Sequence, residues 1–306
     1  MLHEIFYWLL NMSILGGFVG IIVMLLRRVK WFPRAFVYSL WIIPLIRFTL
    51  PYGIASKYSL MTIISNYATR TAIVYDPSGP LPHISATNSI MAAKSYFPIV
   101  YKTDLLRGVF QTASVLWVIV MTALILTGLL LYYFTKREIK EAIHFKNNIY
   151  ISDKITAPAL YGIIRPKILL PLGISNEDIP YVILHEGIHE LRRDNLWRAL
   201  AILICCVHWF NPLIWLCLKY FFEDMELSCD SRVLKSMSRD EQRGYANALL
   251  NFSSKGSLFV TAFGGAKIRV RIENILSYKR LTFFSCISFG ALLGAIILVL
   301  LTNAQF

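Results

Sequence analysis

The sequence has few charged residues and few cysteines for its length. Charged side chains make up 16% of the 306 residues, and all five cysteines lie at Cys205 or beyond. Soluble domains carry about a quarter charged residues, so the composition argues against an ordinary soluble protein. The segment 55–108 contains no cysteine, which excludes a disulfide framework there. Internal repeats and low-complexity tracts are also lacking.

Apolar side chains are abundant instead, at 56% of the chain, with a mean hydropathy of +0.56. Uncharged apolar runs occupy residues 5–26, 109–134 and 281–301. Each run is long enough, at helical rise, to cross a hydrocarbon core of about 30 Å. No cleavage pattern follows the first run, so we expect a retained anchor. A fourth candidate span, residues 35–54, contains Arg47, which can reach the interface.

Lysine and arginine flank the apolar runs in three clusters, which follow residue 26, follow residue 134 and precede residue 281. Because such residues accumulate in cytoplasmic loops, all three clusters should lie inside the cell. That arrangement requires residues 35–54 to cross as well. The formal charge of +13 then indicates membrane topology and contact with lipid headgroups, and we expect no direct binding of nucleic acid.

Four spans divide the chain into five segments. We expect two membrane helices and a basic cytoplasmic loop in 1–54, an outer loop in 55–108, the third membrane helix in 109–134, a cytoplasmic domain in 135–280, and the fourth helix with a short outer tail in 281–306. Nearly half of the chain is therefore expected to form one internal domain.

The expected internal domain begins with short β-type stretches at 149–151, 160–164 and 168–170, which predict a small sheet. Ser175 and Asn176 then offer helix caps, so a helix should begin near them and continue to about Leu191.

This predicted helix contains His185-Glu186-Gly187-Ile188-His189. Residues four apart lie on one helix face, so His185 and His189 can present their imidazoles to one metal ion. In zincin peptidases two such histidines hold zinc, and the glutamate between them is the general base. Glu186 is therefore the predicted base. A chance match of this short motif is the alternative, and the rest of the site must decide.

The apolar stretch 196–222 is divided by Asn211-Pro212 into pieces too short to cross a membrane. We expect a buried or membrane-dipping helical hairpin, with Pro212 in the first turn of a second helix that runs to about Met237. A fifth span would place the later residues on the opposite side of the membrane from His185 and His189.

On that second helix an acidic face is formed by Glu223, Glu226 and Asp230. A catalytic zinc takes three protein ligands, and Glu226 is the predicted third ligand, with Glu223 as its rival. Asp230 is expected to fix a ligand histidine by accepting its other ring proton. Cys229 is expected to pack in the core. A solvated acidic face is the alternative reading.

Several pieces of the chain occur together in a fixed order. They are Gly162 with Arg165-Pro166-Lys167 and Pro171, His185-Glu186-x-x-His189 followed by Arg193-Asp194, His208-Trp209-Phe210-Asn211-Pro212, Glu226-x-x-Cys229-Asp230, and Ala262-Phe263-Gly264 ahead of Arg271-Ile272. In this order and spacing the chain resembles the BlaR/MecR-type membrane metallopeptidases, gluzincin-like sensors that regulate β-lactam resistance. The resemblance spans about residues 1–302.

The resemblance implies a fold class: an α-helical integral membrane protein with four transmembrane helices and a cytoplasmic α+β zincin-like metallopeptidase domain between helices three and four. It implies Zn²⁺ as the cofactor, Glu226 as a zinc ligand in preference to Glu223, and Asp230 as an outer partner of the site. The expected location is the bacterial cell membrane, in a multi-pass arrangement.

The resemblance also implies a signal-transducing zinc endopeptidase that cleaves itself, a cytoplasmic transcriptional repressor, or both. Residues 256–265 are the candidate self-cleavage segment, and a winged-helix DNA-binding repressor is the type of target implied. No Ser-x-x-Lys occurs in the sequence, so we expect no antibiotic acylation on this polypeptide. Membrane lipid and a protein or peptide substrate are the expected partners, and a homodimer is left open.

Two alternatives remain at this point. One is a housekeeping membrane metalloprotease of the heat-shock or prenyl-processing type, against which the His208–Pro212 element and the long outer loop argue. The other is a non-catalytic signalling receptor, against which the complete ligand set and the retained Glu186 argue.

Overall fold

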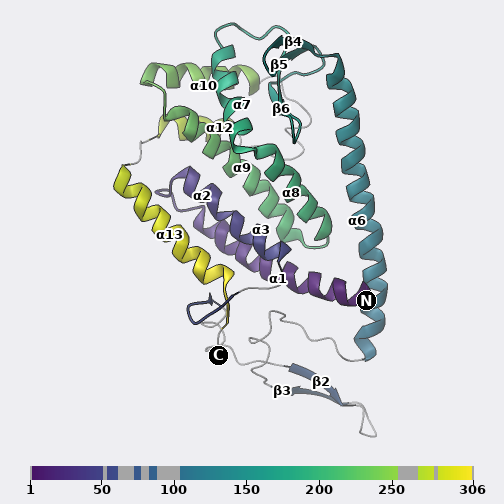
Figure 1. Cartoon of the computed structure of the whole chain (residues 1–306). Coiled ribbons are helices and arrows are strands. Elements are labelled where there is room, and N and C mark those ends of the chain that lie inside the picture. Colours follow the sequence, from purple (N-terminus) through teal and green to yellow (C-terminus); the bar gives the residue numbers. More distant parts are fainter. Residues whose placement is uncertain are drawn as a thin grey trace.

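The structure is a computed structural model that describes residues 2–50, 54–60, 72–76, 83–87, 104–253, 268–278 and 282–304. Long helices fill one end of the molecule, and a small sheet with shorter helices fills the other (Figure 1). The predicted self-cleavage segment 256–265 and most of the predicted outer loop 55–108 lie outside the described residues.

Three helices in the described part of the chain are long and apolar enough to cross a membrane. They are α1 (Leu2–Leu26), α6 (Asp104–Glu138) and α13 (Phe283–Leu301). These helices coincide with the three uncharged apolar runs, so the sequence prediction of three candidate membrane helices is confirmed. Half of the most apolar window of α1 is buried inside the molecule, against 11% for α6 and 6% for α13. In a membrane, lipid would cover the exposed apolar faces of α6 and α13.

The fourth predicted span is divided into two short helices, α2 (Arg34–Leu40) and α3 (Ile42–Thr49), which meet at Trp41. It is therefore not a single long helix. Arg47 within it is buried, and its guanidinium donates hydrogen bonds to the carbonyl oxygens of Leu300 and Thr302 at 2.9 and 2.8 Å. These carbonyls belong to the C-terminal end of α13, where a cation is electrostatically favoured. The arginine thus has polar partners inside the helix bundle.

The predicted small sheet is confirmed and has four strands in the order β4-β5-β7-β6. Their bounds are β4 (Ile143–Lys146), β5 (Ile149–Ser152), β6 (Ala159–Tyr161) and β7 (Lys167–Pro171). The pair β5–β7 is parallel and the other two pairs are antiparallel. Strand β4, which was not predicted, follows the 3₁₀ turn η1 (Ile139–Glu141) at the end of α6.

The helix that carries the two histidines is α7 (Ile179–Arg192), within the predicted stretch. The apolar stretch after it forms α8 (Asp194–Val207) and α9 (Pro212–Leu234), as the prediction of a hairpin required. The Asn211 side chain caps α9 by accepting a hydrogen bond from the Leu213 amide at 2.9 Å. The Asn211 amide group also donates to the backbone and hydroxyl oxygens of Ser13, so the hairpin tip is fixed to the middle of α1.

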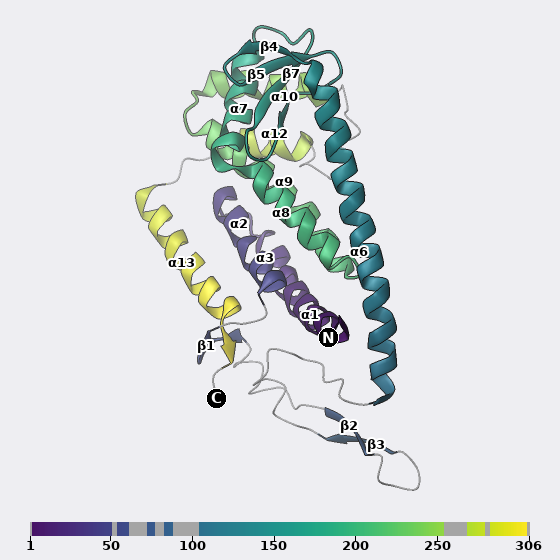
Figure 2. The same cartoon turned by 45° about the vertical axis from the view of Figure 1, so that its right-hand side comes forward.

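Two further helices, α10 (Arg239–Ser253) and α12 (Ile268–Leu276), pack beside α7 and α9. Two small β pairs complete the described chain: β1 (Ala55–Ser56) with β8 (Asn303–Ala304), and β2 (Ala72–Asp76) with β3 (His83–Thr87). Figure 2 shows α6 and the α8–α9 hairpin running alongside each other, with the sheet at the end far from both chain termini.

The main hydrophobic core lies where α9 packs against the membrane-type helices. It contains buried residues from α1, α2, α3, α8, α9 and α13. Glycine permits the closest approach at Gly16, where a Cβ atom would lie 2.6 Å from the ring of Phe48, and at Gly20, where it would lie 2.5 Å from Cys217 Sγ. A second core lies beneath α7, α9, α10 and α12. Helix α9 belongs to both cores, so it connects the helices of the first core (α1, α2, α3, α8 and α13) to those of the second (α7, α10 and α12).

Candidate metal centre

Helix α7 brings His185 and His189 together because they are one helical turn apart on its buried face. Their side chains are 9% and 2% exposed, and their Nε2 atoms are 3.1 Å apart. The rings stand nearly perpendicular, with an angle of 82° between their planes. Two imidazole nitrogens therefore point at one small volume.

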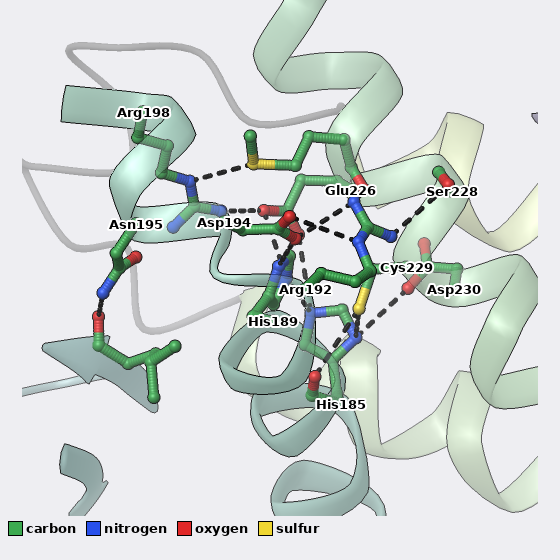
Figure 3. A network of polar contacts seen from close by, with 12 residues as sticks. His185, His189, Arg192, Asp194, Asn195, Arg198, Glu226, Ser228, Cys229 and Asp230 are labelled. Atoms are coloured by element: carbon green, nitrogen blue, oxygen red, sulfur yellow. Dashed lines mark hydrogen bonds and ion pairs between the residues drawn. The ribbon is translucent and has the colours of Figure 1, made fainter. Parts of the chain in front are cut away.

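Helix α9 contributes Glu226 to the same volume (Figure 3). Its Oε2 atom lies 3.5 Å from His185 Nε2, and its Oε1 atom lies 3.6 Å from His189 Nε2. Arg198 on α8 donates to Oε1 at 2.5 Å, and Arg271 Nη1 lies 3.8 Å from Oε2. The structure thus places the three predicted ligands side by side from two helices.

The spacing of these donors matches what zinc requires. Zinc binds histidine nitrogen and carboxylate oxygen at about 2.0–2.2 Å in a tetrahedral arrangement, so two ligands of one ion lie about 3.3 Å apart. The three observed separations are 3.1, 3.5 and 3.6 Å. The last two separations involve different oxygens of Glu226, and Arg271 Nη2 lies 3.4 Å from His185 Nε2. The donors are therefore close to the spacing of zinc ligands, and the Arg271 guanidinium lies in the same volume.

Cys229 offers a second donor set. His185, His189 and Cys229 form a buried group whose donor atoms all lie within 4.8 Å of one another, and this group could hold a metal ion. The Cys229 Sγ atom lies 3.6 Å from His185 Nδ1 and 3.5 Å from the His185 carbonyl oxygen. Burial raises the pKa of its thiol, but the two histidines more than offset that effect and lower it. The side chain is buried, as predicted, and it also contacts the site.

Asp194, at the start of α8, fixes His189. Its Oδ2 atom lies 2.6 Å from His189 Nδ1, and Arg192 donates to both of its oxygens. Arg193 between the two helices has a left-handed backbone, with φ of 55°, and this sharp turn brings Asp194 back to α7. A ligand histidine usually donates its second ring proton to a carboxylate. The sequence analysis names Asp194 within a family motif but assigns it no role, although a carboxylate five positions after the second histidine is the available signal.

Tyr245 and Asp230 lie on the Nδ1 side of His185. The Tyr245 hydroxyl is 2.8 Å from His185 Nδ1 and donates to Asp230 Oδ1 at 2.6 Å. Asp230 itself is 3.5 Å from His185 Nδ1 and fully buried. Arg271 on α12 donates to both Asp230 oxygens, at 2.8 and 2.7 Å. Asp230 therefore reaches the predicted histidine mainly through a tyrosine that sequence reasoning did not find.

Glu186 and Glu223 lie outside this network. Glu186 is half-buried, and within the described ranges no hydrogen bond or ion pair is recorded for its side chain. No lysine, arginine or histidine of the described residues therefore forms an ion pair with its carboxylate. Glu223, the rival ligand, forms an ion pair with Arg27 at 3.1 Å. That contact directs its carboxylate to the end of α1 rather than to the histidines.

Neighbouring charges shift the pKa values of the predicted ligand side chains. Burial lowers the pKa of His185, but Cys229 and Glu226 beside the ring more than offset it and raise the pKa to about 9. Burial raises the pKa of the Glu226 carboxyl, yet His189, His185 and Arg198 hold that pKa well below its usual range. Glu226 is thus an anionic donor at neutral pH. A metal ion has to displace the proton from His185 in order to bind.

Replacing the carboxylate behind His189 should weaken metal binding without removing a donor atom. We expect Asp194→Asn to lower zinc affinity about 10–100-fold, because the amide no longer holds the ring in its metal-binding tautomer. The measurement is competition with a chelator of known zinc affinity, in purified protein. Asp240→Asn is the matched control, since that side chain is 92% exposed. Equal affinities of the two variants would contradict this role of Asp194.

Comparison with known proteins adds a family to this geometry. The family model described as BlaR1 peptidase M56 matches residues 7–275. The chain belongs to this M56 family. The match begins within α1 and ends within α12, so it includes every residue of the metal centre described above and leaves α13 outside.

Several curated proteins that the chain is similar to are named as regulatory or methicillin-resistance proteins. Regulatory protein BlaR1 of Bacillus licheniformis is 33% identical over 174 residues, which are 52% of this chain and 29% of that protein. The methicillin resistance mecR1 protein of Staphylococcus aureus is 24% identical over 278 residues, 80% of this chain and 46% of the relative. Regulatory protein BlaR1 of Staphylococcus aureus is 22% identical over 274 residues, 79% of this chain and 45% of the relative. The chain therefore matches less than half the length of each of these relatives.

Proposed function

We propose that this chain is a membrane-embedded zinc endopeptidase of the regulatory M56 type. The observation that carries the proposal is the convergence of His185 Nε2, His189 Nε2 and the Glu226 carboxylate within 3.6 Å of one another. Two nitrogens and one carboxylate, with a glutamate next to the first histidine in the sequence, are the protein groups of a catalytic zinc site with one open position. The M56 match supplies independent support.

Each residue then has a defined part in peptide hydrolysis. His185 and His189 use their Nε2 atoms as ligands, because Tyr245 and Asp194 occupy the Nδ1 atoms. A bound zinc supplies a Lewis acid that polarises the scissile carbonyl and acidifies the attacking water. The Glu186 carboxylate takes a proton from the attacking water, whose oxygen forms a bond to the carbonyl carbon, and passes that proton to the leaving amine nitrogen. The peptide C–N bond breaks, and a carboxylate and an amine are released.

The proposed substrates are the chain itself and a cytoplasmic repressor. The relatives are named as regulatory and methicillin-resistance proteins, which favours a signalling role over housekeeping proteolysis. Self-cleavage at residues 256–265 is supported by the ends of that segment. Helix α10 ends at Ser253 and α12 begins at Ile268, and Arg271 in the first turn of α12 lies 3.8 Å from Glu226 Oε2. The first helix after this segment therefore contacts the metal centre.

The proposal is tested in the purified full chain reconstituted in lipid vesicles. We expect bound zinc by elemental analysis and slow appearance of fragments cut before Leu281. A chelator should stop this cleavage, and added zinc should restore it. Protein that holds no zinc, or cleavage that a chelator does not affect, would contradict a zinc peptidase and favour a non-catalytic receptor.

We further propose that α2 and α3 together make a fourth crossing, which places the metal centre in the cytoplasm. At one end of this pair, Arg27 before α2 forms an ion pair with Asp224 of α9 at 2.9 Å. At the other end, β1 after α3 pairs with β8 after α13. The pair therefore extends from the domain to the far end of α13. Both the charge clusters and these contacts support four crossings.

Membrane topology gives a direct check of this arrangement. In a Cys286→Ser background, which removes the exposed native cysteine, single cysteines are introduced by Lys30→Cys, Lys57→Cys and Asn147→Cys at exposed positions. We expect an impermeant maleimide to label only Lys57→Cys in intact cells, and all three after lysis. Labelling of Lys30→Cys from outside would contradict four crossings.

A further inference from the structure

Helix α2 contacts the metal centre, although the sequence assigns it to a membrane crossing. The Tyr38 hydroxyl donates to Asp194 Oδ1 at 3.3 Å. The other oxygen of the same carboxylate lies 2.6 Å from His189 Nδ1. One buried carboxylate therefore joins α2 to a proposed zinc ligand.

The ring of Tyr38 strengthens this connection. The guanidinium carbon of Arg192 lies 4.6 Å from the ring centroid, and the same guanidinium binds Asp194. The ring also stacks on Phe221 of α9, with centroids 5.6 Å apart and planes 17° apart. Tyr38 thus holds Asp194 directly through its hydroxyl and indirectly through Arg192.

A second contact from the same membrane-side region reaches the helix that carries Glu226. The indole nitrogen of Trp41, at the junction of α2 and α3, donates to Asp224 Oδ2 at 2.8 Å. Arg27 from the end of α1 donates to both oxygens of Asp224, at 2.9 and 3.0 Å. Asp224 is 1% exposed and lies two residues before Glu226. These bonds fix the turn of α9 from which the proposed carboxylate ligand projects.

We propose that α2 is part of the metal centre: Tyr38 through Asp194, and Trp41 through Asp224, position His189 and Glu226 for the metal. This inference rests on the proposed function, because it concerns the affinity of the same site. Both residues are positioning residues, since neither reaches the metal volume itself.

The consequence is a linkage between the membrane helices and the metal. If α2 moves relative to the α8–α9 hairpin, the two carboxylates lose their partners and the donor set loosens. Linkage is reciprocal, so metal binding must also stabilise α2 in its place against the hairpin. Helix α2 continues through Trp41 into α3, which Arg47 ties to the far end of α13. A displacement that begins at that far end therefore has a direct route to the proposed zinc ligands.

The test uses the purified full chain in detergent, and zinc affinity is measured by competition with a chelator. We expect Tyr38→Phe and Trp41→Phe each to bind zinc about three- to tenfold more weakly than wild type. This loss is smaller than the roughly 10–100-fold caused by removing a direct partner of a ligand, because each residue acts through another carboxylate. Tyr38→Leu, which also removes the ring, should have a larger effect than Tyr38→Phe. Ser39→Ala is the matched control on the same helix, because its exposed hydroxyl only returns to the Ala35 carbonyl.

Two further readouts separate positioning from simple loss of stability. The visible absorption bands of bound Co²⁺ should shift in Tyr38→Phe and Trp41→Phe but not in Ser39→Ala, because they report donor geometry. Zinc should also slow amide hydrogen exchange in residues 34–41 of wild type, and less so in Tyr38→Phe. Tyr38→Phe keeps the ring and its packing, so it remains informative if another variant does not fold.

The outcomes are distinct. Zinc uptake by wild type, with affinities of Tyr38→Phe and Trp41→Phe within twofold of Ser39→Ala and unshifted cobalt spectra, overturns this inference alone. Wild-type protein that binds no zinc overturns the proposed function and this inference with it.

Discussion

Glu226→Gln is expected to lower zinc affinity by more than about 100-fold, a larger loss than removal of an outer partner causes. Glutamine keeps the length of the side chain but loses the charge, and an uncharged amide is a poor zinc ligand. The affinity is measured by chelator competition in the purified chain. The same replacement leaves Arg198 and Arg271 without their shared carboxylate partner, so thermal unfolding without metal should be recorded in parallel.

Cys229→Ser is the matched comparison, because it tests the other buried donor group. We expect zinc affinity within about threefold of wild type, since the Cys229 thiol lies 3.6 Å from the Nδ1 atom of His185, whereas the proposed zinc ligands are the Nε2 atoms. The cobalt-loaded wild type should show no thiolate-to-metal charge-transfer band. If Cys229→Ser loses the metal while Glu226→Gln keeps it, the donor set is His185, His189 and Cys229.

The parts of the site that the sequence predicts are those that depend on local geometry. His185 and His189 share a helix face by their spacing alone, and α7 places them there. Asn211-Pro212 predicts the hairpin, because the Asn211 side chain caps α9 and the fixed ring of Pro212 suits its first turn. Neither effect depends on where the segment lies in the fold. Glu226 was then one of three acidic residues on one face, and only the packing of α9 against α7 brings it to the histidines.

The parts that the sequence does not predict depend on contacts between distant segments. Tyr245 and Arg271 reach His185 from helices 60 and 86 residues away along the chain. No pattern marks Tyr245, and Arg271 belongs to a family motif for which the sequence analysis assigns no role. Tyr38 lies 156 residues from Asp194. Side chains such as these read as ordinary core or surface positions until the fold is known.

Two errors of secondary structure have local causes. The predicted span 35–54 was treated as one helix, but in the described chain α2 ends at Leu40 and α3 begins at Ile42. Pro44 has no amide hydrogen to donate to the Leu40 carbonyl, and its ring crowds that carbonyl, which interrupts the helix there. Strand β4 was missed because it is an edge strand whose four residues are all exposed, with His144 and Lys146 alternating with apolar residues. The alternation in β4 is itself a strand pattern, but four residues are the shortest run over which that pattern can indicate a strand.

Glu186→Gln is expected to bind zinc like wild type and to lose peptidase activity. General-base catalysis contributes about 10²–10⁴-fold, so self-generated fragments should fall to that extent or below detection. Zinc is retained because Glu186 is not in contact with the two Nε2 atoms or with Glu226 among the contacts of the described residues. Mass spectrometry of the chain before Leu281, together with elemental analysis, checks both parts.

Glu190→Gln is the control on the same helix. Glu190 accepts two hydrogen bonds from Asn148, at 2.9 and 2.8 Å, and therefore faces the sheet rather than the metal. It should keep both zinc and cleavage. Fragments from Glu186→Gln at the wild-type rate would mean that another protease makes the cut, and equal loss in both variants would mean that charge on α7 matters only for folding. Loss in Glu186→Gln alone, with zinc in place, assigns the proton transfer to Glu186, since each variant removes one negative charge from α7.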